Sequence, residues 1–342
     1  HAADASDSVE TITVTASPFV SDPDKLSTIV GQVDRDEILR SGGANLSDAL
    51  ANVPGVTGTG FAAGASRPVI RGFDANRVRL LEDGIGSFDV SDVGPDHGVP
   101  IDPLSATKIE VVRGAATLRY GSQAIGGVVN AINNRVPTIL PDKSFAGEAT
   151  ASYGTGADDR EGSALLDGKA GQIAFHADGF IRRTDAYDIP GGTQPNSFFR
   201  GDGASAGASY FFGDSRIGAA IAHYDATYGI PSAETFIDMK QTKGLFRSSF
   251  AMDAGAFKTL TVDGGYADYD HSEIDPATKA TLSTFRSQEW DSRAEAIFDK
   301  IGPLSQSALG VQMQHRDFSA LGEGADYLLP TTTSTVGVFA FT

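Results

Sequence analysis

The sequence contains no cysteine, a single tryptophan and no apolar run that approaches the roughly 18 residues of a membrane-spanning helix. Without cysteine, a small disulfide-stabilised scaffold and a thiolate metal site are both excluded. Basic residues are scarce as well, with 27 lysines and arginines against 44 acidic residues, so the net charge is -17. This balance disfavours a nucleic-acid partner, which requires a basic face, and mildly favours a cationic ligand.

Glycine, in contrast, is abundant, with 40 of 342 residues, and this favours many strands joined by tight turns over helices. The mean hydropathy of -0.14 is that of a soluble protein. A transmembrane β-barrel has a similar value, because its strands alternate lipid-facing apolar and lumen-facing polar residues. The start of the chain, His1-Ala2-Ala3-Asp4, has neither a basic nor an apolar segment, so any signal peptide is expected to have been removed.

The first 143 or so residues predict a small α+β domain. Asn45 is a candidate helix cap, and Pro54 is a stop signal a few residues later. Short β-branched runs bounded by glycine and aspartate predict strands. The expected helices and strands cover residues 36–40, 46–52, 69–71, 78–82, 107–113 and 127–132.

From about Ser144 the pattern changes to long alternating strands. In residues 173–181 the apolar side chains share one face, and His176 and Asp178 share the other. The connections alternate between short turns and long polar loops, as in outer-membrane barrels. Strands of 10 to 16 residues also disfavour a soluble sandwich, whose strands have about 5–6 residues. About ten strands are expected, over residues 144–153, 161–170, 171–184, 199–212, 215–227, 236–252, 257–270, 281–298, 303–317 and 333–342.

Three ordered blocks in the first half carry a family resemblance. They are LSDALANVPGV at 46–56, PVIRGF continuing to VRLLEDG within 68–84, and IEVVRGAATLRYGS continuing to AIGGVVN within 109–130. The chain resembles TonB-dependent outer-membrane receptors, in which a plug domain precedes a transmembrane β-barrel. Ala115 stands where the family usually has proline, and we expect a local loss of rigidity there.

The resemblance implies a fold, a location and a mechanism. The expected fold is an α+β plug domain followed by an antiparallel transmembrane β-barrel in the outer membrane of a Gram-negative bacterium. The ligand would bind between plug and extracellular loops, and the inner-membrane protein TonB would pull on the plug. A short alternating segment resembles the TonB box, which would add as a strand to the C-terminal domain of TonB. Its residues are Glu10, Thr11, Ile12, Thr13, Val14 and Thr15.

The expected domains are a tail at 1–20, a plug at 21–143 and the first part of the barrel at 144–342. A plugged lumen is associated with about 22 strands, and the chain stops inside a strand. We therefore expect this chain to be a fragment with an incomplete barrel, whose remaining strands lie either on another chain or outside the residues of this sequence. Charged plug residues are expected to pair either with the barrel or within the plug, and the sequence leaves both open. They are Arg71, Glu82, Glu110 and Arg113.

Two further segments narrow the resemblance. Residues 91–103 resemble the plug apex loop of the zinc-uptake branch, as does the plug end at 133–137. In that branch an aspartate–histidine pair of the apex loop binds zinc, and this role carries over to Asp96 and His97. The loop after Tyr228 is a departure, because it lacks the histidines that members of this branch often carry.

A second acidic and histidine-containing cluster lies at residues 268–275. His271, Glu273 and Asp275 alternate, so they share a face in an extended chain. We predict a divalent metal site formed by Asp96, His97, His271 and Glu273. Imidazole with carboxylate suits zinc, and also nickel or copper. The alternatives are a solvated acidic loop or a calcium site made of oxygen ligands.

The predicted function is TonB-dependent uptake of a divalent metal ion such as zinc. One alternative is a receptor for a siderophore or other organometallic ligand. The apex loop 86–100 offers Phe88 and no arginine for such a ligand, which disfavours it. Another is a calcium-stabilised transporter of an organic substrate. An enzyme is not expected, because the sequence contains neither G-x-S-x-G nor H-E-x-x-H.

Overall fold

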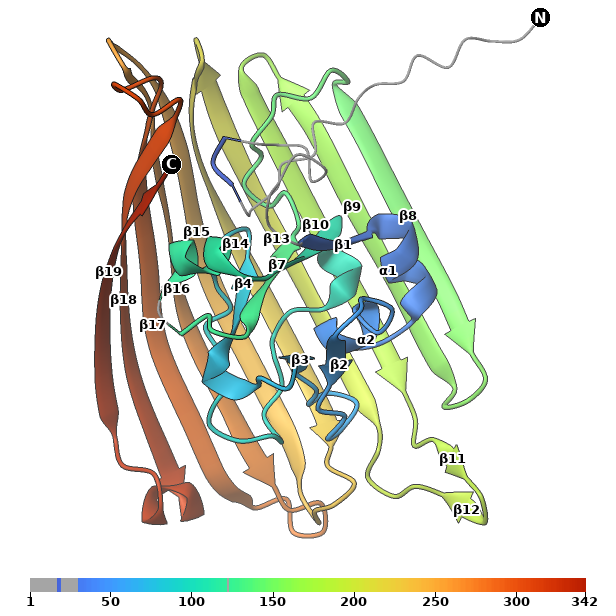
Figure 1. Cartoon of the computed structure of the whole chain (residues 1–342). Helices are drawn as coiled ribbons and strands as arrows, with labels where there is room; N and C mark the ends of the chain where they lie inside the picture. The colour runs from blue at the N-terminus through green and yellow to red at the C-terminus, as the bar shows by residue number, and fades with distance from the viewer. Residues whose placement is uncertain (1–16, 20–29, 122) are drawn as a thin grey trace, which may run out of the picture.

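The computed structural model describes residues 17–19, 30–121 and 123–342. A small N-terminal domain lies in the hollow of a large curved β-sheet (Figure 1). The segment Glu10–Thr15, expected to bind TonB, lies outside the described residues.

The N-terminal domain is built on a five-stranded sheet with the order β1-β6-β7-β4-β5. Strand β4 pairs with β7 in parallel, and the other neighbours are antiparallel. A separate pair, β2 and β3, lies beside it. The elements are β1 Val30–Asp34, α1 Arg35–Ser41, α2 Leu46–Ala49, β2 Val56–Gly58, β3 Pro68–Ile70, η2 Ala75–Arg77, β4 Val78–Glu82, β5 Ile85–Gly86, η3 Pro103–Ser105, β6 Lys108–Val112, η4 Ala115–Tyr120 and β7 Gly127–Ile132.

Both α-helices begin at side-chain caps. Asp34 accepts a hydrogen bond from the backbone N–H of Glu37 at 3.0 Å, and Asn45 accepts one from Asp48 at 3.1 Å. Helix α1 ends at Gly42, whose φ of 64° is readily adopted by glycine. Helix α2 ends at Ala49, before the expected residue 52, because the chain enters turns ahead of Pro54.

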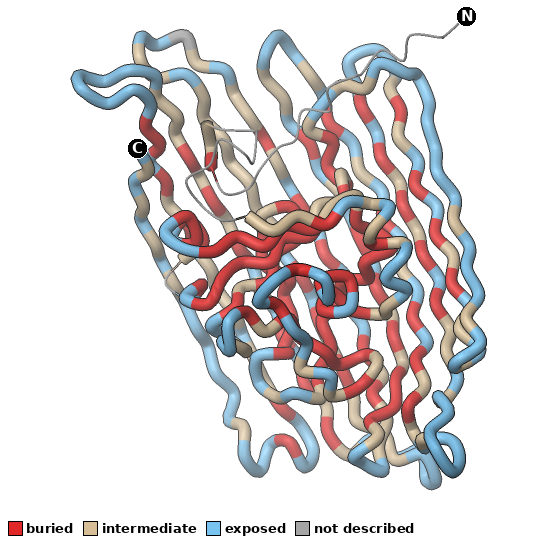
Figure 2. Tube along the Cα trace, turned by 45° about the vertical axis from the view of Figure 1, so that its right-hand side comes forward, coloured by how far each residue is buried: buried red, intermediate tan, exposed pale blue. Residues whose placement is uncertain are grey.

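The four strands expected in this domain are present within a residue at each end, and β1, β2 and β5 were not expected. One apolar core joins the helices to the sheet, with Val33, Ile38, Leu50 and Ile109 among its buried side chains. Figure 2 shows that buried residues concentrate in this domain and on the strands behind it.

The large sheet has ten antiparallel strands in sequence order, β8 to β19, interrupted only by the hairpin of β11 and β12. The ten long strands expected from the sequence are confirmed, and the sheet is open, with β8 and β19 as its outer strands. The strands are β8 Phe145–Gly154, β9 Asp159–Ala170, β10 Ile173–Thr184, β11 Asp188–Ile189, β12 Gly192–Thr193, β13 Phe199–Phe212, β14 Ser215–Gly229, β15 Phe236–Ala254, β16 Phe257–Ile274, β17 Thr281–Phe298, β18 Ser307–Gly322 and β19 Thr331–Phe341.

The two ends of this sheet differ. Three turns of two residues and the longer connection 299–306 lie at one end. The connections 155–158, 185–198, 230–235 and 275–280 lie at the other, as does η5 Glu323–Asp326. The outward face carries exposed apolar side chains, including Ile181, Ile221 and Val338. Such alternation suits a sheet with lipid on its outer side. Among the described residues, no helix combines the length and apolarity needed to cross a membrane.

Candidate metal site between the two domains

Three candidate ligands from distant parts of the chain converge. Asp96 and His97 lie in the loop between β5 and η3, and Glu273 lies near the end of β16. One ligand atom from each residue lies within 4.8 Å of the others. His97 is buried, and the two carboxylates are half-buried. The arrangement offers one imidazole and two carboxylates, drawn from both domains.

The imidazole of His97 is oriented for metal binding. Its Nδ1 lies 3.0 Å from the carbonyl oxygen of Val90. Because a carbonyl only accepts, we assign the proton to Nδ1, which leaves the lone pair on Nε2. That Nε2 lies 3.6 Å from Oδ1 of Asp96. A backbone carbonyl on the second ring nitrogen is a usual way to orient a metal-binding histidine.

His271 lies beside this group. It is fully buried on β16, and its ring centroid lies 4.4 Å from that of His97 in an edge-on arrangement. Its Nδ1 lies 3.0 Å from the Tyr269 hydroxyl, and both imidazoles contact Phe285 at 4.8 to 4.9 Å between centroids. Of the four predicted ligands, Asp96, His97 and Glu273 bring ligand atoms within 4.8 Å of one another, and His271 lies next to this group without belonging to it.

The strand that carries His271 and Glu273 is longer than expected. Strand β16 ends at Ile274, so both residues lie on a strand and not in a loop. Asp275 has a different role from theirs. Its carboxylate accepts hydrogen bonds from the N–H groups of Ala277 and Thr278, both at 2.8 Å, and so forms the turn to β17.

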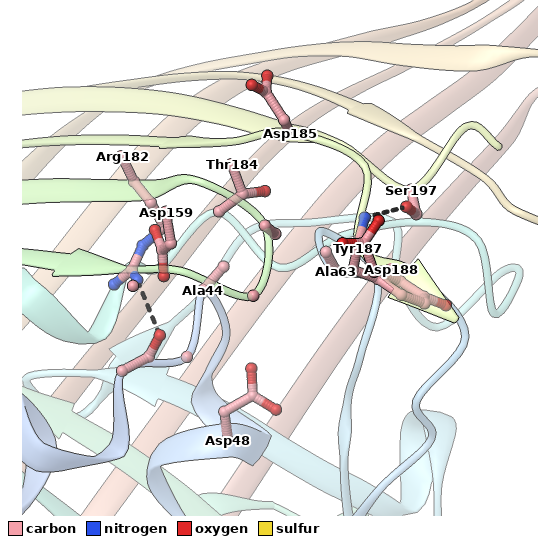
Figure 3. A pocket seen from close by; sticks show the side chains of 15 residues that line it. Ala44, Asp48, Ala63, Asp159, Arg182, Thr184, Asp185, Tyr187, Asp188 and Ser197 are labelled. Carbon is pink, nitrogen blue, oxygen red and sulfur yellow. Dashed lines mark hydrogen bonds between the residues drawn. The ribbon is translucent and has the colours of Figure 1, made fainter. Parts of the chain in front are cut away.

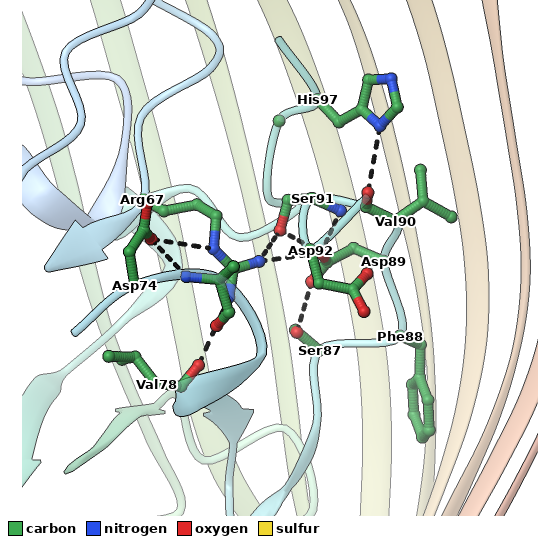
Figure 4. Close-up of polar contacts among 12 residues, drawn as sticks. Arg67, Asp74, Val78, Ser87, Phe88, Asp89, Val90, Ser91, Asp92 and His97 are labelled. Atoms are coloured by element: carbon green, nitrogen blue, oxygen red, sulfur yellow. Dashed lines mark hydrogen bonds and ion pairs between the residues drawn. The ribbon is translucent and has the colours of Figure 1, made fainter. Parts of the chain in front are cut away.

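A buried polar network anchors the loop that carries His97 (Figure 4). Arg67 donates to the Ser91 hydroxyl, and to the carbonyl oxygens of Ala75 at 2.8 Å and Val78 at 3.3 Å. Asp89 accepts from the Ser91 N–H at 2.8 Å and lies 3.7 Å from the Arg67 guanidinium. The loop on either side of Val90 is thereby tied to the start of β4. No sequence motif pointed to this network.

Tyr228, at the end of β14, holds the same loop from the large sheet. Its hydroxyl accepts from the Gly98 N–H at 2.8 Å and donates to the Asp96 carbonyl at 3.0 Å. The ring lies against Gly64, where a Cβ would come within 2.3 Å of the ring. Tyr228 was expected only as the start of a loop.

Of the four charged residues expected to pair, Glu82 bridges the domains. It contacts Arg135 in its own domain and Lys243 on β15. A carboxylate oxygen of Glu110 lies 2.7 Å from the Lys108 ammonium on the same strand, so this pair lies within the N-terminal domain. Arg71 is exposed in a turn at a φ of 51° and forms no ion pair with another described residue. Arg113 has no ion pair to the ten strands among the described residues.

Other ion pairs that link the domains were missed by the sequence analysis. Their partners are separated by 43 to 224 residues along the chain, so no local pattern reveals them. They are Arg35–Glu148 at 2.8 Å, Arg79–Asp291 at 2.8 Å, Asp83–Arg247 at 3.8 Å, Asp92–Arg316 at 3.1 Å, Asp102–Arg182 at 3.1 Å, Arg119–Glu295 at 2.8 Å and Arg135–Asp178 at 3.1 Å.

The remaining histidines have other partners. His176 faces the N-terminal domain, between Asp167 at 2.9 Å and Asp178 at 3.3 Å. His223 lies 2.8 Å from the Thr242 hydroxyl, and His315 lies 2.8 Å from that of Ser334. Each is accounted for by these polar contacts.

A cavity of about 500 Å³ opens at the long-loop end, between the N-terminal domain and β8 to β10 (Figure 3). Asp48, Asp159, Asp185, Asp188 and Arg182 provide its charged lining. A second cavity, of about 230 Å³, lies beside β17 to β19.

Residues 22–128 match the family model described as TonB-dependent Receptor Plug Domain, so the N-terminal domain is a plug domain of that kind. The chain is 29% identical over 192 residues to a hemin receptor of Yersinia enterocolitica, covering 53% of this chain and 27% of the relative. It is 33% identical over 141 residues to an iron-regulated outer membrane virulence protein of Vibrio cholerae, covering 39% and 21%. The vitamin B12 transporter BtuB of Vibrio vulnificus is 27% identical over 186 residues, covering 53% and 29%. The matched part spans 21% to 29% of the length of these relatives.

Solved structures agree on the fold. The copper transporter OprC superposes with a TM-score of 0.70 at 15% identity, covering 87% of this chain and 48% of that one. The alcaligin outer-membrane receptor FauA of Bordetella pertussis gives a TM-score of 0.70 at 16% identity, covering 95% and 54%. The chain thus combines a plug with antiparallel strands of a TonB-dependent type of barrel, and it is a protein of the bacterial outer membrane.

Proposed function

We propose that this protein takes up a divalent transition-metal ion, such as zinc, across the outer membrane by TonB-dependent transport. The observation that carries the proposal is the convergence of Asp96, His97 and Glu273, whose ligand atoms lie within 4.8 Å of one another. Two of these residues belong to the plug and the third to the large sheet. His271 lies next to His97 and is the nearest candidate for a fourth ligand.

The donor set favours a transition metal over calcium. Zinc is satisfied by about four nitrogen and oxygen ligands, with imidazole preferred. Calcium requires about 6–8 oxygen ligands, whereas this site offers two carboxylates and a buried imidazole. Nickel and copper also accept imidazole and carboxylate ligands, so the affinity of the protein for these two ions should be measured alongside that for zinc.

The division of the ligands between two bodies provides a means of release. A pull on the plug moves Asp96 and His97 away from Glu273, which stays with β16. The ion then loses a carboxylate and its affinity falls. Strand addition of Glu10–Thr15 to TonB is the proposed source of that pull.

A second candidate cargo is an organometallic complex such as hemin or a ferric siderophore. It is favoured by the cavity of about 500 Å³ at the long-loop end, which falls in the size range of small-molecule sites. Relatives with the names hemin receptor and vitamin B12 transporter suggest the same class of ligand. A metal ion would bind at Asp96, His97 and Glu273, whereas a metal complex would bind in the cavity beside β8 to β10.

Calorimetric zinc titration tests the metal proposal. His97→Ala should weaken zinc binding by at least about 100-fold, because it removes an oriented ligand. His223→Ala, which removes an imidazole bonded to Thr242, is the matched control and should bind as the wild type does. Binding should also weaken between pH 7.5 and pH 5.5, since protons compete with the metal for imidazole.

The outcomes separate the two cargoes. Equal zinc affinity in wild type and His97→Ala at both pH values would discard the metal site. Tight binding of hemin or a ferric siderophore by that same protein would instead support the complex as cargo. Calcium binding that is insensitive to His97→Ala would point to an oxygen-ligand site elsewhere.

A further inference from the structure

The hydroxyl of Tyr228 contacts both peptide groups that flank His97. The Asp96 carbonyl belongs to the peptide before His97, and the Gly98 N–H belongs to the peptide after it. Tyr228 donates to the first at 3.0 Å and accepts from the second at 2.8 Å. One side chain of the large sheet therefore restrains the backbone of a plug ligand on both sides.

Tyr228 is itself firmly placed. It is fully buried, and its ring packs on Phe199 of β13 with centroids 6.3 Å apart. The plug approaches this ring through two glycines. A Cβ at Gly64 would come within 2.3 Å of the ring, and one at Gly98 within 3.1 Å of the hydroxyl. The absence of side chains at both positions lets the plug backbone reach the tyrosine.

The direction of His97 depends on this restraint. A histidine ligand needs its ring nitrogen held close to the productive position. The Val90 carbonyl orients the ring through Nδ1, while the Tyr228 hydroxyl holds the backbone from which the ring projects. The first restraint moves with the plug, whereas the second is anchored in the sheet.

We propose that Tyr228 is a positioning residue that makes metal affinity at Asp96, His97 and Glu273 depend on the plug being seated against β14. This inference rests on the proposed metal-uptake function. When the plug shifts, the hydroxyl loses both partners at once, and the backbone around His97 becomes free to rotate. The site then weakens through a lost restraint in addition to the separation from Glu273.

Tyr228→Phe tests this inference, since it keeps the ring that packs on Phe199 and removes the hydroxyl. Zinc affinity should fall about 10-fold, the usual order for loss of an outer-shell partner. The visible absorption spectrum of bound Co²⁺ should change in band shape, because the ligand geometry is altered. A purely packing role for the ring predicts no change in either.

Tyr224→Phe is the matched control. Tyr224 is also buried on β14, four residues away on the same face of the strand. Its hydroxyl has no hydrogen bond among the described residues. This variant should retain wild-type zinc affinity and the wild-type Co²⁺ spectrum, and melting temperatures of all three proteins check that folding is intact.

Hydrogen exchange provides a readout without metal. The Gly98 amide should exchange faster in Tyr228→Phe than in the wild type and Tyr224→Phe. Wild-type zinc affinity with an unchanged Co²⁺ spectrum in Tyr228→Phe, or unchanged Gly98 exchange, would overturn the inference about Tyr228. A wild-type protein that binds neither Zn²⁺ nor Co²⁺ would instead overturn the metal-uptake proposal.

Discussion

At the scale of single residues, buried ion pairs hold the plug against the sheet. Arg182 donates to both carboxylate oxygens of Asp102, at 3.1 and 3.2 Å, and also contacts Glu161. Arg182 and Asp102 are almost completely buried. In such a group the attraction mainly offsets the desolvation of the buried charges, so the loss of Asp102 leaves the buried Arg182 guanidinium with only part of its compensating negative charge.

Asp102→Asn is therefore expected to destabilise the protein by about 3 kcal/mol. Asparagine retains an oxygen for the Leu104 N–H that Asp102 caps, so the change isolates the lost charge. The free energy of unfolding from a denaturant titration of the purified protein measures the effect.

Asp202→Asn provides the comparison. Asp202 pairs with Arg183, which follows Arg182 on β10, and the exposed fractions of the two side chains are 54% and 40%. An exposed pair contributes about 0–1 kcal/mol, so this variant should remain close to the wild type. Equal losses for the two variants would contradict the special role of the buried pair.

At the scale of elements, the end of β16 determines which acidic residues face the plug. The sequence predicted a strand end near residue 270, because Asp270, Ser272 and Glu273 resemble a polar loop. Polar residues do not mark the end of a strand that faces a lumen, and β16 continues to Ile274. The alternation expected for His271 and Glu273 therefore occurs in a strand.

This difference distinguishes Glu273 from Asp275. Glu273→Gln should weaken zinc binding by about 10-fold, less than His97→Ala, because it weakens one carboxylate of the set. Asp275→Ala removes a turn cap and should leave zinc affinity unchanged. Calorimetric zinc titration of the two variants shows which of the two carboxylates binds the metal. Weaker zinc binding by Asp275→Ala than by Glu273→Gln would place Asp275 among the ligands.

At the scale of the whole molecule, the proposed mechanism separates binding from transport. Deleting residues 9–15 should abolish uptake of zinc by cells and leave zinc binding by the purified protein unchanged, because only the link to TonB is lost. Uptake of ⁶⁵Zn by cells, paired with calorimetry, measures both. Normal uptake by the deletion variant would rule out the assignment of Glu10–Thr15 as a TonB box.

The architecture was largely predictable from the sequence, because strand alternation and the plug blocks are local patterns. The meeting of Asp96, His97 and Glu273 was predicted because two segments each carried a metal-binding pattern. Tyr228 and Arg67 were missed for the opposite reason. They act through hydrogen bonds to backbone atoms and to a side-chain hydroxyl that lie elsewhere in the sequence, and no spacing along the chain marks such contacts.

The position of β1 has a mechanical consequence. It is an outer strand of the plug sheet, paired with β6 through five residue pairs from Val30↔Val112 to Asp34↔Lys108. A force applied ahead of Val30 acts on this edge strand, which can peel away one pair at a time. The central strand β7 is flanked by β6 and β4, so a force on it must shear two ladders together. The plug is therefore mechanically weak toward a pull from its N-terminus and stiff toward one at its centre.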